Sequence, residues 1–183
     1  MKKLIAVVSC AALMCCVALA GCAGNDAAEE TQAQGENTQI ANPWIDAADA
    51  AEAVEFSGIE FDVDETLDAG VGEPFEVTYR AMEGLVEVTY DNAANQVIVR
   101  KGDPSLAEGG DISGDYGEYP LEWTMQLDSD VEATCYGYVE DAAAKTVWTD
   151  DGYAYSILAI PLGGDDEFGL SAQSVEAYAD TID

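Results

Sequence analysis

The chain has 183 residues, of which 37 are acidic and 6 are basic, and it has no histidine, so its formal charge at neutral pH is −31. A surface this negative argues against binding to nucleic acid and against direct docking on anionic lipid; it favours solubility, cations or a basic partner. Without histidine the chain lacks the commonest general base and metal ligand, and its spacing shows no serine nucleophile elbow, phosphate loop or zinc pattern.

The first 21 residues have the pattern of a secretory signal peptide. A short positive start (MKK) precedes an uncharged, almost wholly apolar run over residues 4–20, which is short for a membrane span. The run ends in LAGC at residues 19–22, which resembles the lipobox of bacterial lipoprotein signal peptides. The resemblance implies cleavage before Cys22 and attachment of diacylglycerol, with chains such as palmitate, to the Cys22 sulfur. An uncleaved anchor and an ordinary signal peptide are the alternatives.

The chain that would remain after cleavage is even more acidic. Residues 22–183 keep all 37 acidic side chains but only four basic ones, which gives a formal charge of −33. Lipidation of Cys22 would leave Cys135 as the one free thiol, so no internal disulfide can form and stability must come from an ordinary core. We therefore expect a protein held by lipid on the extracytoplasmic face of the cell membrane.

Residues 22–42 predict a lipidated, disordered, acidic tether, because they lack an apolar repeat and are rich in Ala, Glu, Gln and Asn. Residues 43–183 then have a length that suits a single domain with one core. A helix is predicted over residues 46–57, with Asp46 as its N-cap and Gly58 as its left-handed end.

Alternating apolar and polar residues then predict a series of strands joined by short turns, which is typical of an antiparallel meander. The predicted strand faces carry Phe75, Val77 and Tyr79; Val86, Val88 and Tyr90; Val97 and Val99; Trp123, Met125 and Leu127; Val131, Ala133 and Cys135; Val147 and Trp148; and residues 153–160. Ser171 is a candidate N-cap for a final helix over about residues 172–181. Helices at both ends of a run of strands predict an α+β domain with the two helices packed on the sheet.

The order of motifs resembles a group of uncharacterised lipoproteins and extracytoplasmic domains from anaerobic, mostly Gram-positive bacteria. The resemblance spans roughly residues 42–182, and its most specific pieces are RKG…DISGDY and W…GYAYSI. It implies an antiparallel sheet with a helix at each end and no known activity, and it supplies no catalytic residues. The segment PSLAEGG at residues 104–110 departs from the group's pattern. A fold-level analogy also exists with periplasmic lipoprotein carriers and envelope-stress sensors.

The loop GGDISGDYGEYP, residues 109–120, is the main candidate site. Asp111, Ser113, Asp115 and Glu122 fit positions 1, 3, 5 and 12 of a calcium loop, but Tyr116 occupies the position that requires glycine. Acidic segments 62–68 and 163–168 are further calcium candidates. We read the loop first as structural, with Ile112, Tyr116 and Tyr119 as apolar pegs on the sheet.

Arg100 and Lys101 form the only basic pair of the mature chain and lie just before this loop. They either anchor an anionic ligand or form an ion pair with Asp111 or Asp115 that holds the loop, and we favour the ion pair. Tyrosines at alternate strand positions could line a glycan- or peptide-binding face, although strands favour aromatic residues for packing alone.

These observations favour a non-catalytic, lipid-anchored extracytoplasmic module that binds a partner protein or small ligand, or senses the envelope. The first alternative is a carrier of an apolar molecule in a groove beneath the helices, which requires a pocket of several hundred Å³. The second is a carboxylate-based hydrolase of wall glycans, which requires two inward carboxylates in a cleft. No catalytic residue and no cofactor are expected.

Overall fold

The computed structural model describes residues 42–67, 70, 75–127, 131–163 and 168–182. The predicted signal peptide, Cys22 and all but the last residue of the predicted tether lie outside these residues. Eight strands form one antiparallel sheet, and two helices accompany it, so the predicted α+β class is confirmed. Among the described residues, no helix has the length and apolarity needed to cross a bilayer.

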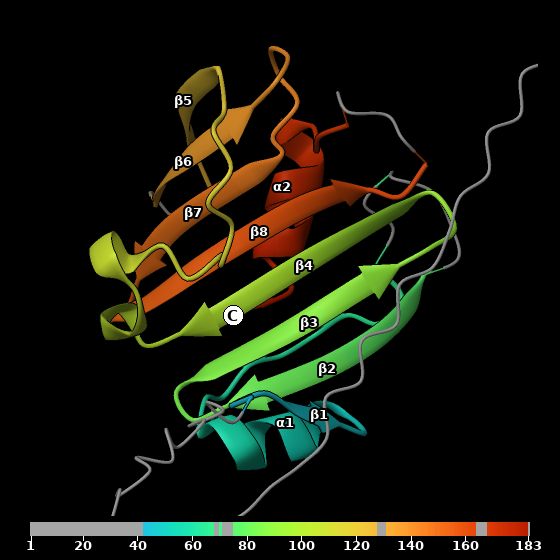
Figure 1. Cartoon of the computed structure of the whole chain (residues 1–183), viewed down its shortest axis with the longest axis vertical. Helices are drawn as coiled ribbons and strands as arrows, with labels where there is room; N and C mark the ends of the chain where they lie inside the picture. The colour runs from blue at the N-terminus through green and yellow to red at the C-terminus, as the bar shows by residue number, and fades with distance from the viewer. Residues whose placement is uncertain (1–41, 68–69, 71–74, 128–130, 164–167, 183) are drawn as a thin grey trace, which may run out of the picture. The chain divides into compact units, whose positions relative to one another are not determined.

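The strands follow the order β1-β2-β3-β4-β8-β7-β6-β5 across the sheet (Figure 1). Their bounds are β1 Ile45–Ala47, β2 Glu76–Met82, β3 Leu85–Asp91, β4 Asn95–Gly102, β5 Leu121–Gln126, β6 Glu132–Gly137, β7 Lys145–Asp150 and β8 Tyr153–Pro161. The expectation of one meander is wrong in its strand order. After β4 the chain crosses to the far edge of the sheet, forms β5, and returns strand by strand until β8 pairs with β4. Short turns are visible in the sequence, but the direction taken by the long 103–120 connection is not.

The first helix, α1 Ala50–Ser57, begins later than its sequence predicted. Its N-cap is Asp49, whose carboxylate accepts a hydrogen bond from the Glu52 backbone N–H at 2.9 Å, and not Asp46. Asp46 belongs to β1, which pairs with β2 and so draws these residues into the sheet. Gly58 ends α1 in the left-handed conformation, as predicted, with φ of 70°.

The final helix, α2 Ala172–Ala179, starts as expected. The Ser171 side chain accepts a hydrogen bond from the Ser174 backbone N–H at 3.2 Å and so caps the helix. Val175 and Tyr178 are fully buried and join the main core. The Tyr178 ring meets the Tyr90 ring of β3 edge-on, with centroids 5.2 Å apart. This contact fixes α2 against the sheet.

One face of the sheet carries the main hydrophobic core. A row of residues in register across β3, β4, β8, β7 and β6 is almost completely buried: Val88, Val99, Ile157, Thr146 and Cys135. Ala53 of α1 belongs to the same cluster, as do the buried residues of α2. Cys135 is a buried free thiol within this core, which explains its presence as a small apolar residue.

The opposite face is covered in part by the long connection between β4 and β5. Two short 3-10 turns, η1 Pro104–Leu106 and η2 Glu108–Gly110, open this connection, and residues 111–120 then cross over β7 and β8. Figure 1 shows the crossing segment in front of the sheet and α2 behind it. The predicted loop 109–120 therefore lies on the face that the helices do not cover.

A row of three charged side chains lies across this second face. Arg80, Glu87 and Arg100 stand in register on β2, β3 and β4. Arg80 Nε lies 2.8 Å from one Glu87 carboxylate oxygen, and Arg100 Nε lies 2.8 Å from the other. The Glu87 side chain is only 1% exposed. Trp44 stacks on both guanidinium groups, with centroid distances of 4.9 and 5.3 Å. Both oxygens of this buried carboxylate are thus paired with positive charge.

Replacing Glu87 with alanine should destabilise the domain by about 3–5 kcal/mol, because two guanidinium groups would lose the buried carboxylate that compensates them. Glu76→Ala is the matched control: Glu76 is an exposed glutamate at the start of β2, and its loss should change stability by no more than about 0.5 kcal/mol. Urea denaturation of a chain that comprises residues 22–183 measures both values. A loss for Glu87→Ala as small as that of Glu76→Ala would contradict the importance of the charged row.

Candidate functional site

Arg100 holds the loop to the sheet through the loop's backbone. Its Nη1 group donates a hydrogen bond to the Ile112 carbonyl at 2.9 Å and another to the Ser113 carbonyl. Gly114 turns the chain here with φ of 67°, and a Cβ atom at this position would stand 2.6 Å from Arg100 Nη1. Glycine is therefore required both for the backbone conformation and for the close approach of the guanidinium group.

Ile112 is the apolar peg of the loop, as predicted. Its side chain is 4% exposed and packs with Leu85 and Ala154 in a small second core on this face. Tyr116 was expected to be a second peg, and this is wrong, because its side chain is 95% exposed.

Lys145 of β7 forms the ion pairs that sequence reasoning assigned to Arg100 or Lys101. Its Nζ lies 3.0 Å from a carboxylate oxygen of Asp111 and 3.8 Å from one of Asp115. It also donates to the Asp115 backbone carbonyl at 3.4 Å, and its side chain is 8% exposed. The assignment failed because β7 lies beneath the loop only through the strand order, which the sequence does not reveal.

Arg100 and Lys101 point to opposite faces of the sheet, because successive side chains in a strand alternate. Arg100 joins the charged row described above. Lys101 faces the other side, where its Nζ lies 5.1 Å from the centre of the Tyr153 ring and 5.6 Å from that of Tyr155. The two residues therefore do not form a joint anion anchor.

Asp111 is held in its ionised form. Burial alone would raise the pKa of its carboxyl group, but hydrogen bonds from Ser113 and from Lys145 outweigh burial and hold that pKa below its usual range. A carboxylate in this state is an ion-pair partner and an acceptor of hydrogen bonds. It is poorly suited to donate a proton in catalysis.

Tyr119 links the loop to a cluster of tyrosine rings. Its hydroxyl donates a hydrogen bond to Asp115 at 2.6 Å, and its ring lies 6.1 Å from that of Tyr136 and 5.2 Å from that of Tyr138. Burial raises the pKa of the Tyr119 hydroxyl well above its usual range, and the bond to Asp115 raises it further. The ammonium group of Lys145 lies over the Tyr119 and Tyr136 rings, at 5.5 and 4.9 Å from their centres.

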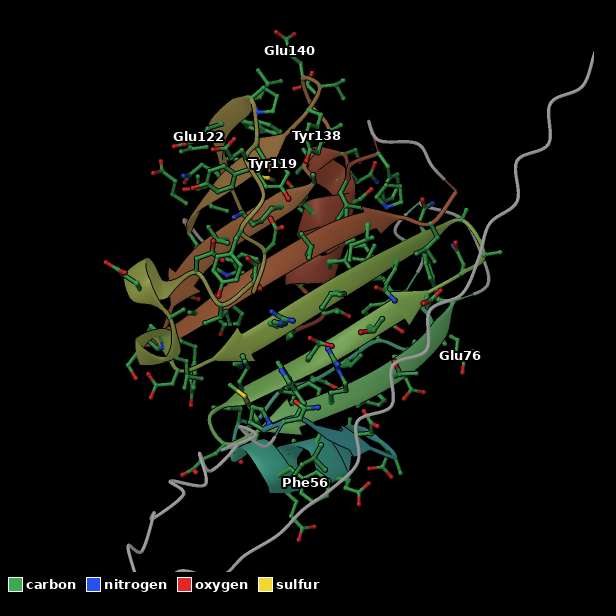
Figure 2. All side chains as sticks on the ribbon, viewed as in Figure 1. Phe56, Glu76, Tyr119, Glu122, Tyr138 and Glu140 are labelled. Atoms are coloured by element: carbon green, nitrogen blue, oxygen red, sulfur yellow. The ribbon has the colours of Figure 1, made fainter. Side chains whose placement is uncertain are left out.

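A groove of about 620 Å³ begins at this cluster and runs over the face that the loop partly covers. Tyr119 and Tyr138 form one wall and contribute aromatic surface; Figure 2 shows both at the same end of the sheet. The remaining lining comes from Asp115, Ala144, Leu158, Ala159, Ile160, Pro161 and Phe168. Sequence reasoning identified Asp115 and Tyr119 but missed Leu158, Ile160 and Phe168, since nothing in an apolar strand distinguishes residues at a groove from residues in a core.

Three further hollows among the described residues were compared with the alternative functions. The hollow beneath α2, lined by Trp123, Cys135 and Val175 among others, has about 160 Å³, less than the several hundred Å³ expected for a carrier. A second hollow of about 340 Å³ is lined by Asp62, Asp64 and Asp180, with Val63 and Thr181. A third of about 770 Å³ lies at the end of α1, where Ser57, Gly58 and Ile59 line it together with residues of the β2–β3 and β7–β8 turns and of the segment 103–106.

Two of the carboxyl groups that line these hollows, Asp64 and Asp103, have pKa values below their usual range. Hydrogen bonds from the Thr66 side chain and backbone lower the pKa of Asp64, and those from the Ser105 backbone and side chain lower that of Asp103. Within the described ranges, no group of three or more acidic or cysteine side chains is placed to hold a metal ion. Residues 68 and 164–167, parts of two calcium candidates, lie outside those ranges.

Comparison with known proteins gives no match: no family model, no curated protein and no solved structure is significantly similar to this chain.

Two substitutions in the loop should have very different effects on stability. Ile112→Ala should destabilise the domain by about 2–4 kcal/mol, because it removes buried methylene groups and leaves a cavity. Tyr116→Ala, four residues away, removes an exposed ring and should cost no more than about 0.5 kcal/mol. Thermal or urea unfolding of both variants tests this. Equal losses would mean that the loop is not fixed through Ile112.

Proposed function

We propose that this chain is a membrane-anchored extracytoplasmic lipoprotein that binds a partner or ligand without catalysis, in the groove lined by Tyr119, Tyr138 and Phe168. The observation that carries the proposal is the groove itself. Its tyrosine wall is held from behind by the contacts of Lys145, Asp111 and Asp115. A rigid aromatic wall beside an apolar floor is typical of binding surfaces, since aromatic rings offer a large contact area at a low entropic cost.

The anchor rests on the N-terminal pattern. A basic start, an apolar run and LAGC at residues 19–22 together favour lipidation of Cys22. Two acyl chains give stable attachment where one gives only marginal binding. A tether of residues 23–42 would let the domain reach about 25 Å from the bilayer, which is enough to expose the groove to partners on the extracytoplasmic side. The resemblance to uncharacterised bacterial lipoproteins agrees with this proposal.

Binding is favoured over the two alternatives by the geometry of the hollows. A carrier beneath the helices would need more room than the hollow under α2 offers. A glycan hydrolase needs a carboxylic acid with a raised pKa, whereas the described carboxyl groups with shifted pKa values, Asp64, Asp103 and Asp111, all shift downward. An envelope sensor would use the same groove to register its ligand.

Cys22→Ser should abolish lipidation and processing at this site, because serine lacks the sulfur that accepts the diacylglycerol. Membrane fractionation and mass spectrometry of the N-terminus measure the outcome. Wild type should be found in the membrane fraction with an acylated Cys22. A Ser variant that is still cleaved before residue 22 and still fractionates like wild type would refute the anchor.

The groove should be the part of the domain that captures a partner. In a pull-down from native membranes, Tyr138→Ala bait should retain about fivefold less of any partner than wild-type bait, since an aromatic contact contributes on the order of 1 kcal/mol. Tyr116→Ala is the matched control, because Tyr116 is more exposed than Tyr138 but does not line the groove. Equal capture by all three baits would place the binding surface elsewhere.

A further inference from the structure

The basic side chains of the mature chain are all used inside the domain. Arg80 and Arg100 pair with Glu87, Lys145 pairs with Asp111 and Asp115, and Lys101 lies over two tyrosine rings. These four are the whole complement of lysine and arginine in residues 22–183, against 37 acidic residues. The surface around the groove therefore offers carboxylates without competing lysine or arginine side chains of its own.

The tyrosine cluster at the end of the groove already binds one ammonium group. Lys145 approaches the rings of Tyr119 and Tyr136 from the sheet side. Tyrosine rings attract cations through the negative charge of their faces. Tyr138 belongs to the same cluster, but its side chain is 46% exposed, so its ring is open to a cation from outside.

Two exposed glutamates lie at the same end of the sheet as the cluster. Glu122 of β5 stands directly opposite Tyr136 of β6, so both side chains leave the same face of the sheet. Glu140 follows Tyr138 by two residues. Figure 2 shows Glu122 and Glu140 at the end of the molecule where Tyr119 and Tyr138 lie, far from Glu76. Aromatic faces attract ammonium and guanidinium groups, and carboxylates in the neighbourhood add a Coulombic attraction.

We propose that the groove binds an extended segment of a partner protein in which a lysine or arginine is followed by apolar residues. The basic side chain lies against Tyr138, at the end of the sheet that carries Glu122 and Glu140, and the apolar residues lie on Leu158, Ile160 and Phe168. This inference rests on the proposed function, because it names the chemical class of the ligand for the same groove.

Charge selects this occupant over others. A second copy of the chain carries the same charge of −33 and would be repelled, as would an anionic ligand or an anionic membrane surface. A neutral glycan could stack on Tyr138, but it would leave Glu122 and Glu140 without a role. A basic segment satisfies both the rings and the carboxylates, and the field of the whole domain accelerates its approach.

The test uses a short fluorescein-labelled peptide in which lysine alternates with valine, and the mature chain, in a buffer of about 0.15 M salt. Fluorescence anisotropy measures Kd. Tyr138→Ala should weaken binding by about fivefold, and the double variant Glu122→Gln/Glu140→Gln should weaken it by at least as much. Replacing each lysine of the peptide with glutamine should weaken binding to wild type to the level of the double variant or below.

A matched double variant separates a specific site from general attraction between a basic peptide and an acidic protein. Glu55→Gln/Glu76→Gln removes the same number of charges from exposed glutamates of α1 and β2, away from the groove, and should leave Kd within about twofold of wild type. An equal effect of both double variants would overturn the proposal, because binding would then follow net charge alone.

Two further outcomes would also overturn it. If the glutamine–valine peptide binds as tightly as the lysine–valine peptide, the charge of the ligand does not contribute to binding. The second outcome concerns a neutral oligosaccharide of N-acetylglucosamine. If it binds wild type more tightly than Tyr138→Ala, and the basic peptide does not bind, the groove is a glycan site. In both cases the groove would remain the binding surface, whereas equal capture by the wild-type, Tyr138→Ala and Tyr116→Ala baits would refute the proposed function itself.

Discussion

The buried carboxylate of Glu87 organises the face of the sheet on which the groove lies. It joins Arg80 and Arg100 across three neighbouring strands, and Arg100 extends from it to two backbone carbonyls of the loop. A buried carboxylate is costly unless it is paired and hydrogen-bonded, and here each oxygen has its own guanidinium partner. Glu87 in β3 therefore contributes to the position of the loop, together with the buried Ile112 side chain and the ion pairs of Lys145. Because Arg100 contacts carbonyl groups, this attachment depends on the backbone of Ile112 and Ser113 rather than on their side chains.

The same use of charge explains why so acidic a chain can fold. With few cations and many carboxylates, each lysine or arginine contributes most where solvent screens it least, which is in the interior. Arg80, Arg100 and Lys145 lie on the loop-covered face, and Arg100 and Lys145 hold the loop from below. Among the described residues, Glu87 is the one acidic side chain that is fully buried. The exposed acidic residues therefore favour solubility, whereas the basic residues stabilise the fold. The cost is self-repulsion at the surface, which a basic partner would relieve.

Local patterns in the sequence predicted local structure well. The strands β2, β3 and β4, the Ser171 cap, the end of α1 at Gly58 and the burial of Ile112 were predicted from residues close in sequence, and all are found in the structure. Strand β3 is buried on both faces, so the alternation in its sequence does not separate buried from exposed residues. Errors arose where distant segments decide. Residues 45–47 join the sheet only because β2 offers them an edge, and Lys145 meets the loop only because β7 lies beneath it. The floor of the groove was missed for the same reason. In the sequence Leu158 is an ordinary strand residue, and only the strand order shows that it lies on the open face.

The groove is therefore a consequence of how the loop is held and not of a separate motif. Lys145 fixes Asp115, the Asp115 carboxylate accepts the hydroxyl of Tyr119, and the Tyr119 ring supports that of Tyr138. Each step orders the next one before any ligand arrives, so little conformational entropy remains to be lost on binding at this wall. Tyr138, at the exposed end of the series, combines a supported ring with an open face. The ammonium group of Lys145 orders the tyrosine wall from inside the domain. The open face of Tyr138 is then available to a lysine or arginine side chain of the proposed partner.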